Sequence, residues 1–285
     1  MTIERVFVAG AGLMGHGIAQ VLAAAGRRVE LYEPELARAI AGRDRVAAGV
    51  DRLVAKGRLT PPEREALLAL ITPTDRPDVV GVADLAIEAI PEDLDLKRSL
   101  LAGLDGRAPG RTIIATNTSS IPIAVLAEVI APGRRARFVG MHFFSPVPVM
   151  PLVEVVRGAE TDPETVAAIV GLAGELGKRT IVSADRPGFI VNRTLFPLLV
   201  EAMRVLEEGT GSAADIDAGA RLGLNHPMGP LELADFIGLD VCLDILRMLR
   251  DGLGERYAPP RVLEELVAEG RLGRKTGSGF HEYGR

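Results

Sequence analysis

The chain has 285 residues, of which 47% are hydrophobic and 25% charged, and its formal net charge is −5 at pH 7. This length exceeds that of a typical single domain, and the composition is that of a folded globular protein, so we expect two domains and a sizeable core. The acidic balance argues against nucleic acid as a partner, because binding a phosphate backbone needs a dense basic face.

Cysteine content and apolar runs indicate the compartment. Cys242 is the only cysteine and lies in an apolar helical pattern, which excludes an internal disulfide and favours a buried thiol. The N-terminus enters a strand pattern without the features of a signal peptide, and no apolar run reaches about 18 residues. We therefore expect a cytoplasmic protein that does not cross a membrane.

A glycine-rich turn, G-A-G-L-M-G, follows the first predicted strand and opens a helical pattern. Gly10 permits a tight turn, Gly12 lets the backbone approach a pyrophosphate, and Gly15 lets the helix pack closely on the strand. A second strand at 28–32 leads to Glu33, where a carboxylate can accept hydrogen bonds from both hydroxyls of an adenosine ribose. This order predicts a dinucleotide site, and Glu33 favours NAD because it would repel the 2′-phosphate of NADP.

Strand and helix patterns alternate through most of the chain. Strands are predicted at 5–9, 28–32, 83–89, 112–116, 137–141, 152–156 and 179–183, and helices at 35–56, 93–104, from 122, and at 163–176. Such alternation predicts an α/β fold with a mostly parallel, Rossmann-type sheet wrapped by helices.

The pattern changes to helices alone after Pro187 and Gly188. We therefore expect a dinucleotide-binding domain at 1–185 and a helical domain at 186–285. Helices of the second domain are predicted at 189–206, from the capping box that begins at Ser212, at 231–249 and at 261–268. A small, very apolar helical domain commonly needs a partner to cover it, so we expect a homodimer.

The stretch H-F-F-S-P-V-P-V-M-P-L-V-E gathers candidate acid–base groups. His142 follows the predicted strand 137–141, prolines stiffen the loop beyond it, and Glu154 lies on the next apolar run, so the two side chains can face each other. Histidine suits proton transfer at neutral pH, and a carboxylate on one ring nitrogen fixes its tautomer. The pattern predicts a general base with its orienting partner, or else a histidine at a strand end and a glutamate on a solvated face.

Polar residues Asn117-Thr118-Ser119-Ser120 stand where the predicted strand 112–116 ends. In open α/β sheets such residues line the ligand crevice, so Asn117 and Ser119 are candidates for contact with substrate or nicotinamide. The alternative is that a serine caps the helix that starts near 122. A nucleophilic serine is not expected, because the G-x-S-x-G turn is absent.

A basic cluster surrounds a predicted helical hairpin that Gly57 and two prolines interrupt. The cluster consists of Arg52, Lys56, Arg58 and Arg64. It predicts either a site for a second phosphorylated ligand or a solvated charged face, and both interpretations remain open.

The chain resembles the short-chain 3-hydroxyacyl-CoA dehydrogenases, and most closely the bacterial 3-hydroxybutyryl-CoA dehydrogenases. The matching blocks are G-A-G-L-M-G-H-G-I-A-Q, I-E-A-I-P-E, N-T-S-S, G-M-H-F-F, P-G-F-I-V-N-R, N-H-P-M-G-P-L-E-L-A-D-F-I-G-L-D and L-G-R-K-T-G, in this order. The resemblance implies a Rossmann-type NAD domain followed by a helical dimerisation domain. It also implies reversible oxidation of (3S)-3-hydroxyacyl-CoA by NAD⁺ to 3-oxoacyl-CoA, NADH and a proton.

The resemblance further implies roles for individual residues. His142 would be the general base, paired with Glu154, while Ser119 and Asn192 would hold the substrate oxygen. Lys56 would lie at the coenzyme A end of the substrate. Besides the three glycines and Glu33, cofactor contacts are implied for Leu13, Met14, Glu92, Lys97, Asn117 and Lys275. No metal is expected.

Two departures from the family pattern lie beside this site, where Ser145 replaces an asparagine and Pro151 replaces a lysine. They leave the acyl-chain preference open, so a 3-hydroxyadipyl-CoA substrate is an alternative, as is an NAD-binding relative without turnover. Dehydrogenases of 3-hydroxyacids or 6-phosphogluconate use a lysine for proton transfer, where this chain offers His142. The remaining histidines, at 16, 226 and 281, have no carboxylate partner close by in sequence.

Overall fold

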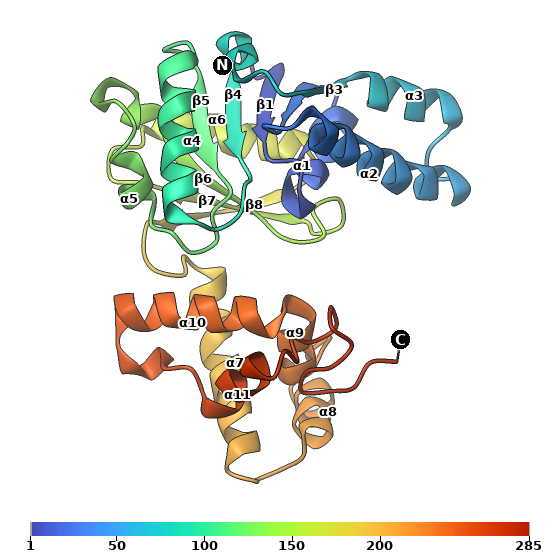
Figure 1. Cartoon of the computed structure of the whole chain (residues 1–285), viewed down its shortest axis with the longest axis vertical. Helices are drawn as coiled ribbons and strands as arrows, with labels where there is room; N and C mark the ends of the chain where they lie inside the picture. The colour runs from blue at the N-terminus through green and yellow to red at the C-terminus, as the bar shows by residue number, and fades with distance from the viewer. Residues whose placement is uncertain (1, 285) are drawn as a thin grey trace. The chain divides into compact units, whose positions relative to one another are not determined.

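The computed structural model describes residues 2–284, and the chain divides after Arg186 into two compact units. The first unit is built on one β-sheet, and the second is helical apart from isolated bridges near its end (Figure 1). Among the described residues, no helix combines the length and the apolar character needed to cross a membrane.

The first unit contains eight strands in the order β3-β2-β1-β4-β5-β6-β7-β8. The strands are β1 (Arg5–Ala9), β2 (Arg28–Tyr32), β3 (Ile71–Thr74), β4 (Leu85–Glu88), β5 (Ile113–Thr116), β6 (Phe138–Phe143), β7 (Leu152–Arg157) and β8 (Arg179–Ala184). Neighbouring strands are parallel except β6 and β7, which are antiparallel. The prediction of a mostly parallel Rossmann-type sheet is therefore confirmed.

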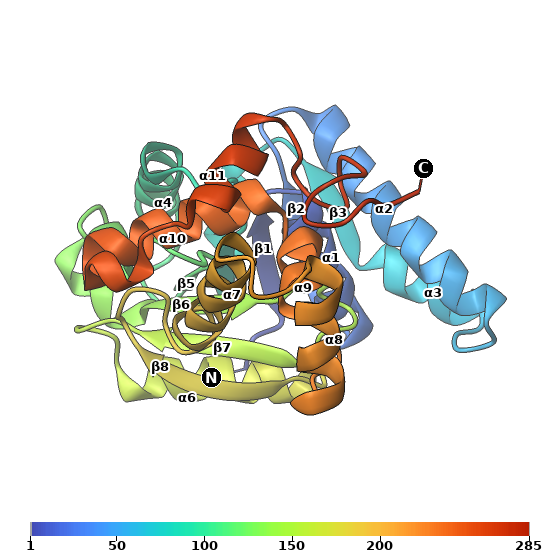
Figure 2. The same ribbon diagram turned by 90° about the horizontal axis from the view of Figure 1, so that it is seen from below.

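Helices cover both faces of this sheet, as its apolar strand runs require. They are α1 (Leu13–Ala24), α2 (Leu36–Ala55), α3 (Pro61–Ala69), α4 (Leu94–Arg107), α5 (Ile123–Ala127) and α6 (Pro163–Glu175), with 3₁₀ turns η1 (Pro77–Val82) and η2 (Pro132–Arg137). Buried side chains of α1 and α6 share one core cluster with the strands. Figure 1 shows α4 in front of the strands and α6 behind them, and Figure 2 shows α6 alongside β7 and β8.

Two sequence predictions for this unit need correction. The strand predicted to end at Met141 continues to Phe143, so His142 lies inside β6 and pairs across to β7. The strand β3 was not predicted, because its sequence I-T-P-T contains a proline, which a strand tolerates at an edge. The predicted helical hairpin is present as α2 and α3, and Thr60 caps α3.

The second unit packs its helices around one apolar core. They are α7 (Val191–Glu207), α8 (Ala213–Gly223), α9 (Pro230–Ile237), α10 (Leu239–Leu253) and α11 (Arg261–Ala268), with the 3₁₀ turn η3 (Glu255–Tyr257). The prediction of a single helix at 231–249 is wrong, because this stretch forms the two helices α9 and α10. Gly238, with φ of 105°, ends α9 and begins α10, a backbone conformation that favours glycine.

Candidate functional site

The glycine turn between β1 and α1 has the shape of a phosphate cradle. Gly10 has φ of 104°, and a Cβ on Gly15 would clash with the Gly10 carbonyl oxygen, so both positions need glycine. A Cβ on Gly12, the N-cap of α1, would instead meet nothing within 4 Å. The turn therefore leaves open space in front of the first N–H groups of α1, which fits the pyrophosphate of a dinucleotide.

Glu33 lies beside this turn, directly after β2. Its Oε1 accepts a hydrogen bond from the backbone N–H of Ala11 at 2.7 Å, so the carboxylate is held between the end of β2 and the glycine turn. This is the position in which an acid can bind the adenosine ribose. Leu13 is exposed and Met14 half-buried at the start of α1, and their contacts with a cofactor stay predictions.

His142 and Glu154 lie opposite each other on the antiparallel strands β6 and β7. The His142 Nδ1–H donates to Glu154 Oε2 at 3.0 Å, and the two residues are 6% and 0% exposed. The Phe144 ring lies 4.4 Å from the imidazole, measured between ring centroids. The predicted contact between the histidine and the glutamate is thus present, and burial strengthens their interaction because water does not screen it.

Asn117 connects the strand that carries His142 to its neighbours. Its side-chain Oδ1 accepts from the backbone N–H of Phe143 at 2.8 Å, and its backbone N–H donates to the backbone carbonyl oxygen of Glu88 at 2.8 Å. The ends of β4, β5 and β6 are thereby fixed together. These are the carboxyl ends of parallel strands, where α/β sheets bind ligands.

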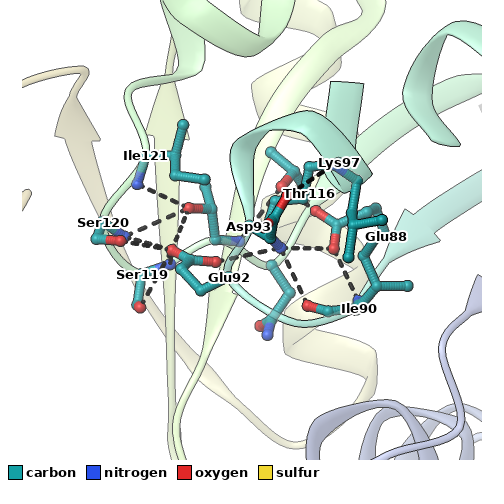
Figure 3. A network of polar contacts seen from close by, with 12 residues as sticks. Glu88, Ile90, Glu92, Asp93, Lys97, Thr116, Ser119, Ser120 and Ile121 are labelled. Atoms are coloured by element: carbon teal, nitrogen blue, oxygen red, sulfur yellow. Dashed lines mark hydrogen bonds and ion pairs between the residues drawn. The ribbon is translucent and has the colours of Figure 1, made fainter. Parts of the chain in front are cut away.

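The carboxylate of Glu92 organises the loop that carries Ser119 (Figure 3). Its Oε1 accepts from the backbone N–H groups of Ser119 and Ser120, both at 2.9 Å, and from the hydroxyl of Thr118 at 2.6 Å. Burial raises the pKa of Glu92, but the charge of Lys97 and the hydrogen bonds from Thr118 and Ser120 outweigh it and lower the pKa to about 2. Glu92 is therefore an anion that holds this loop in shape.

Lys97 and Glu88 form a buried ion pair beside Glu92 (Figure 3). The Lys97 ammonium lies 2.6 Å from Glu88 Oε1 and 3.2 Å from both the Ile90 carbonyl oxygen and Glu92 Oε2. The other oxygen of Glu88 accepts from the Thr116 hydroxyl at 2.6 Å. Lys97 is 1% exposed, and its ammonium already has three protein acceptors. The predicted contact of Lys97 with the cofactor stays a prediction.

Glu88 is a site residue that the sequence reasoning missed. The available signal was an acid next to the end of the strand predicted at 83–89, and in the structure Glu88 ends β4 and pairs in register with Thr116 at the end of β5.

The remaining predicted contacts concern residues outside these groups. Lys56 is exposed at the end of α2. Asn192 is 9% exposed on α7, and Lys275 forms an ion pair with Asp240 at 2.5 Å, both within the second unit. Their contacts with substrate and cofactor stay predictions. Between residues 2 and 284, no group of three or more His, Cys, Asp or Glu side chains is arranged to hold a metal ion.

Comparisons with known proteins cover the whole chain. Residues 5–186 match the 3-hydroxyacyl-CoA dehydrogenase NAD-binding domain, and residues 188–283 match the C-terminal domain of the same family. A Bacillus subtilis (strain 168) protein named "Probable 3-hydroxybutyryl-CoA dehydrogenase" is 44% identical over 284 residues, which are 99% of this chain and 98% of the relative. The 3-hydroxybutyryl-CoA dehydrogenase of Bradyrhizobium diazoefficiens is 43% identical over 99% of this chain and 96% of its own.

A solved structure agrees with this match. The crystal structure of (S)-3-hydroxybutyryl-CoA dehydrogenase from Ralstonia eutropha superposes with a TM-score of 0.96 at 44% identity, covering 100% of both chains. The match in sequence and fold extends over both units. The chain therefore belongs to the 3-hydroxyacyl-CoA dehydrogenase family of NAD-dependent oxidoreductases.

Proposed function

We propose that the protein catalyses the reversible oxidation of (3S)-3-hydroxybutyryl-CoA to the 3-oxoacyl-CoA, with NAD⁺ as the oxidant. The observation that carries this proposal is the buried pair of His142 and Glu154, with Nδ1 and Oε2 3.0 Å apart. The four-carbon acyl group is supported by the names of relatives that are 43% and 44% identical over nearly the full chain.

The glycine turn and Glu33 would hold the cofactor. Gly12 leaves space for the pyrophosphate, and Glu33 would accept the hydrogen bonds of the ribose hydroxyls. When bound, NAD⁺ supplies a hydride acceptor for C3 of the substrate. The protein is left to bind, orient and deprotonate the alcohol.

Proton transfer is assigned to His142. Its Nε2 would accept the proton of the substrate 3-hydroxyl, while the Nδ1–H bond to Glu154 fixes the ring orientation and the tautomer. The buried carboxylate would stabilise the imidazolium that forms. In the reverse direction the imidazolium returns the proton to the oxygen of the 3-oxo group.

Ser119 and Asn192 would orient the reacting oxygen. Hydrogen bonds from a hydroxyl and an amide can stabilise negative charge that develops there, and they are most effective when the donors are held in place beforehand. Glu92 supports this for Ser119 by binding its backbone N–H at 2.9 Å. Lys56, exposed at the end of α2, would meet the coenzyme A part of the substrate.

A substrate comparison tests the proposal. We expect NADH oxidation with acetoacetyl-CoA, and a higher kcat/KM for the four-carbon than for the eight-carbon, sixteen-carbon and 3-oxoadipyl-CoA substrates. NADPH should be a poorer donor, because Glu33 would repel the 2′-phosphate. Preference for the adipyl compound would instead favour the alternative 3-hydroxyadipyl-CoA dehydrogenase, and no turnover with any of them would favour an NAD-binding protein without activity.

A homodimer in the cytoplasm is part of the same proposal. The second unit exposes large apolar side chains, and such surfaces support association when they are contiguous. Leu222 and Leu224 on and after α8 are 87% and 63% exposed, and Phe236 on α9 is 47% exposed. Light scattering on the purified protein should give twice the mass of 30.2 kDa, and a monomer would contradict the dimer.

A further inference from the structure

Lys178 is a buried lysine outside the candidate site. It lies in the turn between α6 and β8 and is 9% exposed. Its ammonium donates to the carbonyl oxygens of Val147 at 2.6 Å and Met150 at 2.8 Å. Both acceptors belong to the loop 144–151, which joins the strand of His142 to the strand of Glu154.

Lys178 holds the loop 144–151 through hydrogen bonds to two backbone carbonyls and not through an ion pair; we call this arrangement a clamp. Its two acceptors are neutral carbonyl groups, and burial lowers the pKa of the lysine. Within the loop, the N–H groups of Val149 and Met150 both donate to the Pro146 carbonyl at 2.9 Å. The ammonium therefore binds a compact turn at two points, and removing it would leave two carbonyls without this donor.

The same loop packs against the helix that begins at the glycine turn. Val147 is 2% exposed, and a Cβ added to Gly17 of α1 would lie only 2.9 Å from the Val147 Cβ. The loop is also held at its far end, where the backbone N–H of Arg179 donates to the Pro151 carbonyl at 2.7 Å. Its position is thus set by α1 on one side and by the α6 to β8 turn on the other.

We propose that Lys178 is a positioning residue for the reaction: by clamping loop 144–151, it holds His142 and Glu154 in register and keeps the histidine strand fixed against α1. The inference rests on the proposed function, in which His142 transfers the proton. The hydrogen bonds of Lys178 go to the backbone of Val147 and Met150 and not to the side chains of the pair. Its effect is exerted through the two strand ends that the loop connects.

Replacement of the ammonium tests this role. Lys178→Met retains an apolar chain of similar length but removes the donors, and we expect kcat with acetoacetyl-CoA to fall about tenfold while KM and the NADH dissociation constant change less than about twofold. The matched control is Arg179→Met, which removes an exposed cation at the next position and keeps the backbone bond to Pro151. It should keep wild-type kcat. A wild-type kcat in Lys178→Met would overturn the inference.

A double-mutant cycle separates positioning from a general loss of stability. If Lys178 acts through the pair, the tenfold effect of Lys178→Met should shrink to less than about twofold when Glu154 is already glutamine, because the charged hydrogen bond that Lys178 helps to align is then absent. Equal effects in both backgrounds would overturn the inference.

Hydrogen exchange gives a readout independent of activity. The amides of Val149 and Met150 should exchange faster in Lys178→Met than in the wild type and Arg179→Met, and unchanged protection would contradict the clamp. The failure of the proposed function is recognised separately, since it would appear as full turnover in His142→Gln. Loss of turnover in that variant together with wild-type kcat in Lys178→Met would refute only the role of Lys178.

Discussion

The Nδ1 atom of His142 lies 3.0 Å from Oε2 of Glu154, in a pair that the antiparallel register of β6 and β7 places side by side. Both side chains are buried, and the hydrogen bond between them gives each one a polar partner in place of water. A buried, hydrogen-bonded pair of this kind fixes the ring in one orientation and one tautomer. These are the properties that a general base needs.

Replacing His142 with glutamine should remove the proton acceptor while retaining a polar side chain. General base catalysis contributes roughly 10²–10⁴-fold, so kcat for acetoacetyl-CoA reduction should fall by about this factor. NADH binding, measured by fluorescence titration, should be unchanged. The control is His226→Gln, which alters a histidine of the second unit and should retain turnover. Unchanged turnover in His142→Gln would refute the assignment of the base.

Replacing Glu154 with glutamine should preserve shape but remove the charge. A hydrogen bond to a charged group contributes about 1.5–3 kcal/mol, so kcat should fall roughly 10- to 150-fold. Glu160→Gln is the matched control, because Glu160 is an exposed acid that pairs with Arg135 at 3.1 Å and surface pairs of this kind contribute little. If both variants lost the same activity, a specific role for Glu154 would be excluded.

Glu33→Ala should weaken NADH binding, because the ribose loses a charged hydrogen-bond acceptor. The expected increase in the dissociation constant is about 10- to 100-fold, and NADPH should be disfavoured less than before. Glu35→Ala serves as the control, since Glu35 is exposed and its side chain makes no capping bond to α2. A dissociation constant equal to that of the wild type would argue against the ribose contact.

Two glycines of the cradle should respond differently to alanine. Gly15→Ala places a Cβ against the Gly10 carbonyl, so it should lower the free energy of unfolding by roughly 1–3 kcal/mol. Gly12→Ala meets open space and should leave stability nearly unchanged, yet weaken NADH binding, because its Cβ would stand in front of the pyrophosphate. Denaturant unfolding and NADH titration of both variants check this contrast. Equal NADH affinity of Gly12→Ala and the wild type would contradict the cradle.

Glu92 should make stability depend on pH in the acid range. Its pKa is lowered from 4.5 to about 2 in the folded protein, so its ionised form stabilises the fold above about pH 4.5, and this contribution is lost as the pH falls toward 2. The difference in Tm between the wild type and Glu92→Gln should therefore narrow across this window. A constant difference between wild type and Glu92→Gln would contradict the stabilised carboxylate.

Features that depend on short spacing could be predicted from the sequence. The order of strand, glycine turn, helix and acid placed Glu33 beside the cradle, where its carboxylate binds Ala11. The pairing of His142 with Glu154 followed from two apolar runs joined by a short loop, because such runs form neighbouring strands. The prediction that the strand of His142 ends at Met141 was wrong, because nothing in the local sequence distinguishes the last paired residue of β6 from the first residue of the loop.

Other contacts depend on how distant segments of the chain pack together. Glu88 binds Thr116, and Glu92 binds the loop of Ser119, because β4 and β5 are adjacent in the sheet. Lys178 binds the carbonyl oxygen of Val147, which lies 31 residues earlier in the chain. His281 contacts Asp217, which lies 64 residues earlier in the chain, at 2.6 Å. Local sequence patterns were enough to predict which elements form and which chemical groups they carry. Strand order and helix packing determined the partners, because hydrogen bonds of buried charged groups join segments that are distant along the chain.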